Sequence, residues 1–92
     1  MAHIVFVNPK KDIKREEVTR VIAAISKGYC SFDTNCWCLT GGGDSIEIRD
    51  ALKRTNIFDK IAVFALTGYW ASAGLGANAT KWLKDYIEPQ EE

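Results

Sequence analysis

The stretch that decides the fold is residues 59–87, DKIAVFALTGYWASAGLGANATKWLKDYI. It contains KIAVFAL at residues 60–66, in which Lys60 is followed by a continuous apolar run, a pattern typical of a buried strand. A glycine-interrupted connection follows, and either Asn78 or Thr80 opens a short helix that runs to Ile87. We therefore expect the chain to end in a strand and a closing helix, followed by an acidic tail that frays.

The amino-terminal residues predict another buried strand followed by a helix. HIVFVN at residues 3–8 is an apolar run that Pro9 should end, because proline cannot donate a hydrogen bond to a sheet. We expect Asp12 to cap a helix over residues 13–26, in which the apolar side chains share one face. Gly28 stands where a glycine commonly ends a helix.

The middle of the chain predicts a hairpin and a second helix. Residues 29–33 and 36–40 both alternate in polarity, which favours two paired strands. Asp44 and Glu47 have the spacing of a capping box, and the helix that they begin runs to about Arg54. The fold class that follows is α+β, a ferredoxin-like βαββαβ sandwich with an added C-terminal helix.

Both faces of the predicted sheet carry apolar side chains. Val5 and Val7 point to one face of the first strand, and Ile4 and Phe6 point to the other. An antiparallel sheet with one wet face should alternate between apolar and polar residues, so something should cover the second face. We expect a second copy of the chain to do so, giving a homodimer. The C-terminal helix with Trp82 is the alternative cover.

Composition describes a single small domain, residues 1–92, of globular character. Apolar residues make up 47% and charged residues 26%, which excludes a disordered chain. Twelve basic residues balance twelve acidic ones, so the chain as a whole has no long-range attraction for nucleic acid. Without a long apolar run or a signal-peptide pattern, we expect a cytoplasmic protein and no contact with a membrane.

A local basic cluster still indicates a nucleic-acid site. Lysines and an arginine gather before and at the start of the first helix, and two aromatic residues follow the last strand. Phosphate contacts combined with base stacking use this pairing of residue types. The alternative is a solvated start of the helix, with the aromatics packing the last helix onto the sheet. The candidate nucleic-acid-binding residues are Lys10, Lys11, Lys14, Arg15, Tyr69 and Trp70.

The remaining polar candidates are a strand-end asparagine and three thiols. Asn8 ends the first strand, where it either presents a polar group at a cleft or makes an Asx-type turn. Cys30, Cys36 and Cys38 lack the C-x2-C spacing of zinc sites, and their odd number favours reduced thiols. They are either metal ligands or small apolar side chains in a sheet. His3 is the only histidine, so the residues alone show no catalytic set.

Half of the chain resembles the small bacterial SinR-like proteins, a group distinct from the biofilm regulator of that name. Their pattern is a helix with an I-R-D-x-L-K core, a strand ending in L-T-G, a late glycine and W-L-K near the C-terminus. The matching residues here are Ile48, Arg49, Asp50, Leu52, Lys53, Leu66, Thr67, Gly68, Gly74, Trp82, Leu83 and Lys84.

The resemblance implies a homodimer. SinR-like proteins are similar to the CRISPR-associated ferredoxin-like nuclease family and to virulence-associated protein D, in which some members are metal-dependent nucleases. Those nucleases carry an aspartate at the end of the first strand, one from each subunit, where this chain has Asn8. An amide is a poor Mg²⁺ ligand and cannot accept a proton as a carboxylate can.

Two functions follow as expectations. The first is a non-catalytic homodimeric interaction module of this nuclease type, which binds nucleic acid or a protein partner and needs no cofactor. The alternative is a Mg²⁺-dependent endonuclease that acts on RNA or DNA, with Asn8 or the nearby Asp12 in the metal role.

Overall fold

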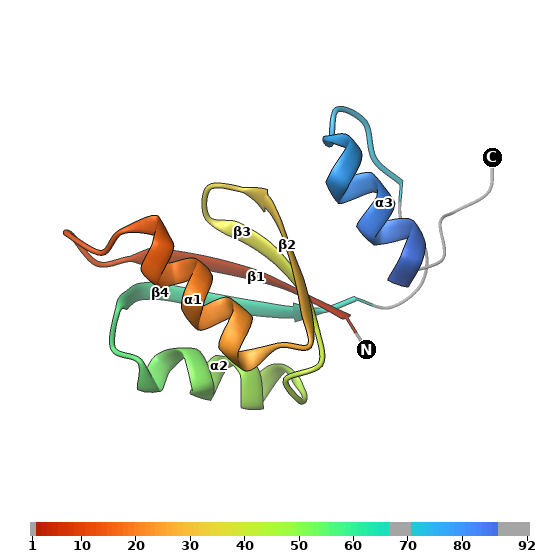
Figure 1. The fold of residues 1–92 in the computed structure, drawn as a ribbon. Helices are drawn as coiled ribbons and strands as arrows, with labels where there is room; N and C mark the ends of the chain where they lie inside the picture. Colours follow the sequence, from red (N-terminus) through yellow and green to blue (C-terminus); the bar gives the residue numbers. More distant parts are fainter. Residues whose placement is uncertain (1, 67–70, 87–92) are drawn as a thin grey trace.

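A computed structural model of the chain describes residues 2–66 and 71–86 (Figure 1). Its elements are β1 (Ala2–Pro9), α1 (Arg15–Ile25), β2 (Gly28–Asp33), β3 (Cys36–Thr40), α2 (Ser45–Arg54), β4 (Phe58–Ala65) and α3 (Ala77–Tyr86). None of the helices in these ranges has the length and apolar character that crossing a bilayer requires. The predicted order of strands and helices, including the closing helix, is confirmed.

The four strands form one antiparallel sheet in the order β2-β3-β1-β4. β1 lies inside the sheet, and β2 and β4 are the edge strands among the described residues. The predicted hairpin is confirmed, because β2 pairs directly with β3 and places Cys30 opposite Cys38. The fold is therefore α+β, with a single antiparallel sheet.

The core lies between the sheet and two helices. α1 and α2 lie side by side on one face of the sheet (Figure 1). Val5 from the sheet, Ile22 from α1 and Ile48 and Leu52 from α2 are fully buried in one apolar cluster. Full burial of an aliphatic side chain contributes about 1.5–3 kcal/mol, so this face of the sheet supplies most of the hydrophobic stabilisation.

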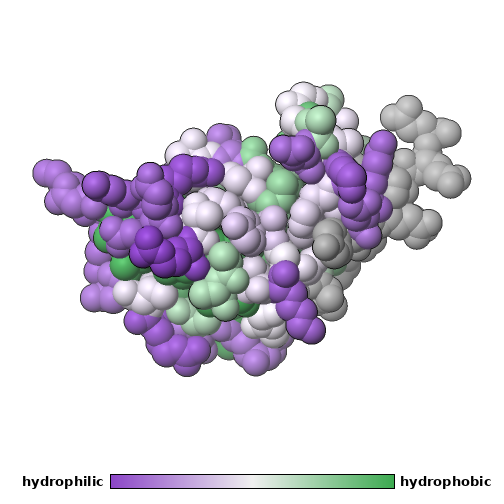
Figure 2. Space-filling model, viewed as in Figure 1, coloured by the Kyte–Doolittle hydropathy of each residue, from purple (hydrophilic) through white to green (hydrophobic). Residues whose placement is uncertain are grey.

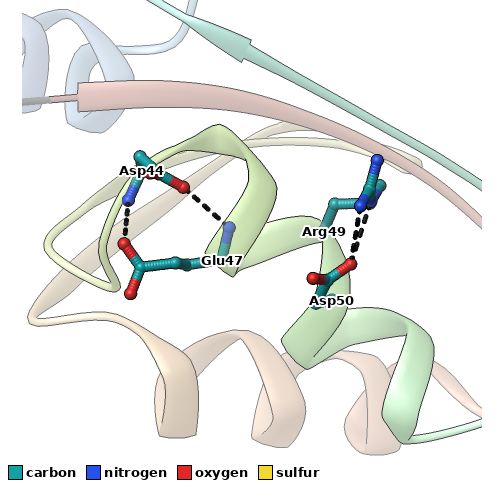
Figure 3. A network of polar contacts seen from close by, with 4 residues as sticks. All are labelled: Asp44, Glu47, Arg49 and Asp50. Carbon is teal, nitrogen blue, oxygen red and sulfur yellow. Dashed lines mark hydrogen bonds and ion pairs between the residues drawn. The ribbon is translucent and has the colours of Figure 1, made fainter.

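The predicted capping box at the start of α2 is confirmed. The Asp44 carboxylate accepts a hydrogen bond from the backbone N–H of Glu47 at 2.8 Å. The Glu47 carboxylate accepts one from the backbone N–H of Asp44 at 3.2 Å (Figure 3). Two backbone donors that the helix leaves unpaired are thus satisfied, and the position of α2 in the sequence is fixed locally.

Two predictions about the ends of α1 are wrong. Asp12 does not cap the helix: it lies in the preceding turn with φ 74°, and the N-cap is Lys14, whose side chain makes no capping hydrogen bond. Gly28 does not end the helix either, because it is the first residue of β2. The C-cap, Ser26, already has extended backbone angles, so the chain passes from helix to strand without a left-handed glycine turn.

Candidate nucleic-acid interface and open sheet face

The basic segment predicted to bind nucleic acid forms the turn between β1 and the start of α1. Lys11 and Lys14 are exposed there. Lys10 donates from Nζ to Oδ1 of Asn56 at 3.0 Å, in an exposed contact with the turn after α2. Strongly hydrophilic residues gather at this end of the molecule in the space-filling view (Figure 2). Three lysines thus occupy one end of the domain, and one of them, Lys10, is already hydrogen-bonded within the chain.

Arg15, at the start of α1, is hydrogen-bonded to the β2–β3 hairpin. Its Nη1 donates to the carbonyl oxygen of Thr34 at 2.8 Å, and its Nη2 donates to Oγ of Ser31 at 2.7 Å. The guanidinium carbon lies 4.9 Å from the ring centroid of Trp37, within the range of a cation–π contact. This candidate binding residue therefore ties the first turn of α1 to the β2–β3 hairpin.

Asn8 lies beside a hollow of about 520 Å³ at one end of the sheet. It is exposed on β1 and stands directly opposite Lys60 of β4. Among the described residues, the Asn8 side chain has no hydrogen bond that would form an Asx turn. The hollow is lined by Phe6, Val7, Asn8, Asn35, Lys60, Ile61 and Ala62. The strand-end asparagine is thus presented to a cleft whose lining contains amides and a lysine but no carboxylate.

Large aromatic side chains are exposed on the sheet face that α1 and α2 do not cover. Phe6 is 48% exposed and Phe64 is 55% exposed, and their rings form an edge-to-face pair with centroids 6.2 Å apart. The half-buried side chains of Ile4 and Ala62 flank them, because Ile4 pairs with Phe64 and Phe6 pairs with Ala62. We call these four residues the open face: Ile4, Phe6, Ala62 and Phe64.

The other half of this sheet face is covered. Cys38 lies there on β3 and is fully buried. α3 contacts β2, and its Ala79 and Leu83 are buried, whereas Trp82 is half-buried. The predicted cover by the C-terminal helix is thus found over β2. It leaves the open face over β1 and β4 uncovered among the described residues.

The three cysteines share this covered half. Cys30 stands opposite Cys38, and Cys36 lies two residues before Cys38 on the same strand face. All three are free thiols. Burial raises the pKa of each, and it raises that of Cys38 to about 12, with a smaller effect from its thiol neighbours. Their burial and raised pKa values favour small apolar side chains in the sheet. Residues 2–66 and 71–86 contain no group of three or more metal-ligating side chains.

His3 is buried on the opposite side of the sheet from the thiols. It is 1% exposed, and neither ring nitrogen has a hydrogen-bond partner. Burial disfavours the charged imidazolium and lowers the pKa of His3. His3 therefore cannot join the cysteines around one metal ion, and its side chain is held neutral.

Sequence reasoning missed a groove between α1 and β2. Arg15, Glu16, Thr19, Arg20, Ala23 and Tyr29 line this hollow of about 420 Å³. The signal was available in part, because Arg15 and Arg20 belong to one predicted helix. Their meeting with Tyr29 depends on how the hairpin packs. Tyr69 and Trp70, the two aromatic candidates, lie outside the described residues.

No protein-family model, curated protein or solved structure matches this chain. The resemblance to SinR-like proteins therefore rests only on the matching residues between Ile48 and Lys84.

Proposed function

We propose that this chain is a non-catalytic, homodimeric interaction module that binds nucleic acid. The observation that carries the proposal is the open face, which exposes an aromatic pair on the side of the sheet away from α1 and α2. A contiguous exposed apolar patch is typical of an interaction surface. A second copy of the chain can cover it, because a two-fold axis brings the same apolar patch of the two subunits together.

The size of the patch supports a dimer centred on Phe6 and Phe64. An aromatic side chain offers roughly 150–250 Å² of surface, and about half of each of these rings is exposed. Two such rings supply roughly a quarter of the ~800 Å² that each partner buries in a standard interface. They therefore serve as the apolar centre, with Ile4, Ala62 and the surrounding polar residues completing the contact.

The ferredoxin-like arrangement of the fold is part of the same proposal. The chain order of strands and helices, together with the strand order β2-β3-β1-β4, supports a ferredoxin-like arrangement. SinR-like proteins and the related CRISPR-associated ferredoxin-like nucleases, to which the chain bears its resemblance, carry that arrangement. The proposal also places the protein in the cytoplasm, where its three free thiols stay reduced.

Nucleic acid is the partner that the exposed cations support. Lys11 and Lys14 project at one end of the domain, outside the open face, so a dimer leaves them available. Their contribution is local, since the whole chain has no net charge. Binding through phosphate contacts should therefore be strongest at low salt.

The lining of the Asn8 hollow supports a module without catalysis. The nuclease alternative needs Mg²⁺, which prefers carboxylate oxygens, and the hollow offers amides and Lys60 instead. The variant Asn8→Asp restores a carboxylate at this position. If it creates cleavage that depends on Mg²⁺, the scaffold holds a dormant nuclease site; if it does not, the nuclease mechanism does not apply to this chain.

The test is fluorescence anisotropy of short labelled single-stranded RNA and DNA, with Mg²⁺ present, across a salt series. We expect binding that weakens with salt and leaves the probe intact. Probe loss that EDTA stops would instead support the Mg²⁺-dependent endonuclease. An absence of binding at low salt would remove nucleic acid from the proposal and leave a dimer that binds proteins.

A further inference from the structure

The groove between α1 and β2 combines two arginines with an aromatic ring. α1 supplies Arg15 and Arg20, and β2 supplies Tyr29, which is 40% exposed although it pairs with the buried Leu39. The groove exists because β2 is an edge strand, so no further strand closes this side among the described residues. A hollow of about 420 Å³ thus runs between a helix and a sheet edge, with cations on one wall and an aromatic ring on the other.

Arg15 is preorganised within this groove. Its two hydrogen bonds to the hairpin and its contact with Trp37 fix the guanidinium. A guanidinium has five N–H donors and two serve these bonds, which leaves three for a ligand. A cation that is already ordered loses less side-chain entropy on binding than a free lysine does. This wall of the groove is therefore suited to hold an anion.

Arg20 adds a second cation along the same wall. Nothing among the described residues pairs with its guanidinium, and the side chain is exposed. It follows Arg15 by five residues, which places it about 7.5 Å along the helix axis and about 140° around it. The two arginines therefore stand at opposite margins of the helical wall, and both line the groove, so an extended anionic chain that crosses the groove meets both guanidinium groups.

Tyr29 forms the opposite wall. Its ring is braced by Trp37, with centroids 6.0 Å apart and planes at 53°. A braced, exposed aromatic ring is a platform for a nucleobase, and such stacking strengthens binding about 5- to 150-fold per base. An acidic peptide would use the arginines but would leave this ring without a matching partner.

We propose that this groove binds a single-stranded nucleic acid, with phosphates at Arg15 and Arg20 and a base stacked on Tyr29. The inference rests on the proposed nucleic-acid function and extends its binding surface from the exposed lysines to this groove. The groove lies on the helix side of the sheet, because Tyr29 pairs with a residue of the buried core, whereas the open face is on the other side. A dimer through the open face leaves the groove accessible.

Glu16 also lines the groove and opposes an anion. Its carboxylate lowers the affinity for phosphate by like-charge repulsion, and it does so for RNA and DNA alike. We therefore expect opposite effects of two changes in the groove. Removing the negative charge of Glu16 should strengthen nucleic-acid binding, whereas removing the positive charge of Arg20 should weaken it.

The experiment measures the anisotropy of short labelled single-stranded RNA and DNA with the full chain and its variants. Arg20→Gln should weaken binding and lower the slope of log K against log salt by about 0.7, the value for one lost phosphate contact. Tyr29→Leu should weaken binding about 5- to 150-fold through the lost stack. Glu16→Gln should tighten it. Arg54→Gln, an equal change of charge at an exposed position on α2, should bind as the wild type does at matched salt.

The outcomes separate the groove from the proposed function. If the wild type binds but Arg20→Gln and Tyr29→Leu bind equally well, the groove is overturned and the function stands. If Arg54→Gln weakens binding as much as Arg20→Gln, the effect is general charge and the groove is again overturned. A wild type that binds no nucleic acid overturns both. If a glutamate-rich labelled peptide binds and Arg20→Gln abolishes only that binding, the groove is a peptide site. Thermal unfolding monitored by circular dichroism checks that each variant is folded.

Discussion

Arg15 gives the sharpest prediction about what stabilises the domain. Arg15→Ala removes a hydrogen bond to the Thr34 carbonyl, another to Ser31 Oγ and the cation–π contact with Trp37. Each hydrogen bond contributes about 0.5–1.5 kcal/mol net, and an exposed cation–π contact about 0.5–1 kcal/mol. The sum is about 1.5–4 kcal/mol, and water that replaces the guanidinium at this exposed site should keep the loss near the lower end.

The assay is equilibrium unfolding in urea, with thermal unfolding beside it. A loss of about 1.5 kcal/mol should lower the Tm by about 6–12 °C in a domain of this size. Arg15→Lys keeps the charge but not the planar fork, and should fall between Arg15→Ala and the wild type. Arg20→Ala is the matched control, because it removes an arginine without a partner among the described residues and should stay within about 0.5 kcal/mol of the wild type.

A double-mutant cycle isolates the contact between α1 and the hairpin. Ser31→Ala removes the acceptor for Arg15, so the combined variant should lose less stability than the sum of the two single changes. We expect a coupling free energy of at least about 0.5 kcal/mol. Equal unfolding free energies for Arg15→Ala and Arg20→Ala, with no coupling to Ser31, would refute the view that Arg15 fastens the helix to the hairpin.

Three further predictions concern single side chains. Asp44→Ala removes the cap of α2 and should cost about 1 kcal/mol in urea unfolding, whereas Glu47→Gln keeps an acceptor oxygen and should cost less. Burial lowers the pKa of His3 in the folded state. Its contribution to the free energy of unfolding is therefore fully present above the unfolded pKa of about 6.5, and it is lost as the pH falls below that value. His3→Leu should remove that loss, as thermal unfolding across this pH range would test. The pKa of Cys38 is raised to about 12, so at neutral pH a thiol reagent should react with Cys38 only after unfolding, and later than with the half-buried Cys30. Rapid labelling of Cys38 in the folded protein would contradict its burial.

The parts of the fold that the sequence predicted are those fixed by neighbouring residues. The capping box of α2 needs only Asp44 and Glu47, three residues apart, so its pattern survives in the structure. The ends of α1 depend instead on distant partners. The first turn is fastened by Ser31 and Thr34, and the chain enters β2 directly after Ser26. Local capping rules therefore placed those ends wrongly.

The candidate site divides in the same way. Alternation along β1 predicted that Val5 and Phe6 would point to opposite faces of the sheet, and that the face without helices would need a cover. Which half of this sheet face stays uncovered depends on the packing of α3 against β2. That contact joins residues far apart in the sequence, so no local pattern predicts it. The groove was hidden for a similar reason, because Arg20 and Tyr29 meet only once the hairpin packs beside α1.

The central claim is that the open face docks a second copy of the chain, and sedimentation velocity across a concentration series tests it most directly. We predict that the wild type and Phe64→Leu sediment as dimers, because leucine keeps an apolar side chain at the centre of the interface. Phe64→Lys should sediment as a monomer, since it would bury an unpaired charge there. Ala24→Lys adds the same charge at an exposed position on α1 and should remain dimeric. A wild type that stays monomeric at every concentration, or a dimer that Phe64→Lys leaves intact, would contradict the account.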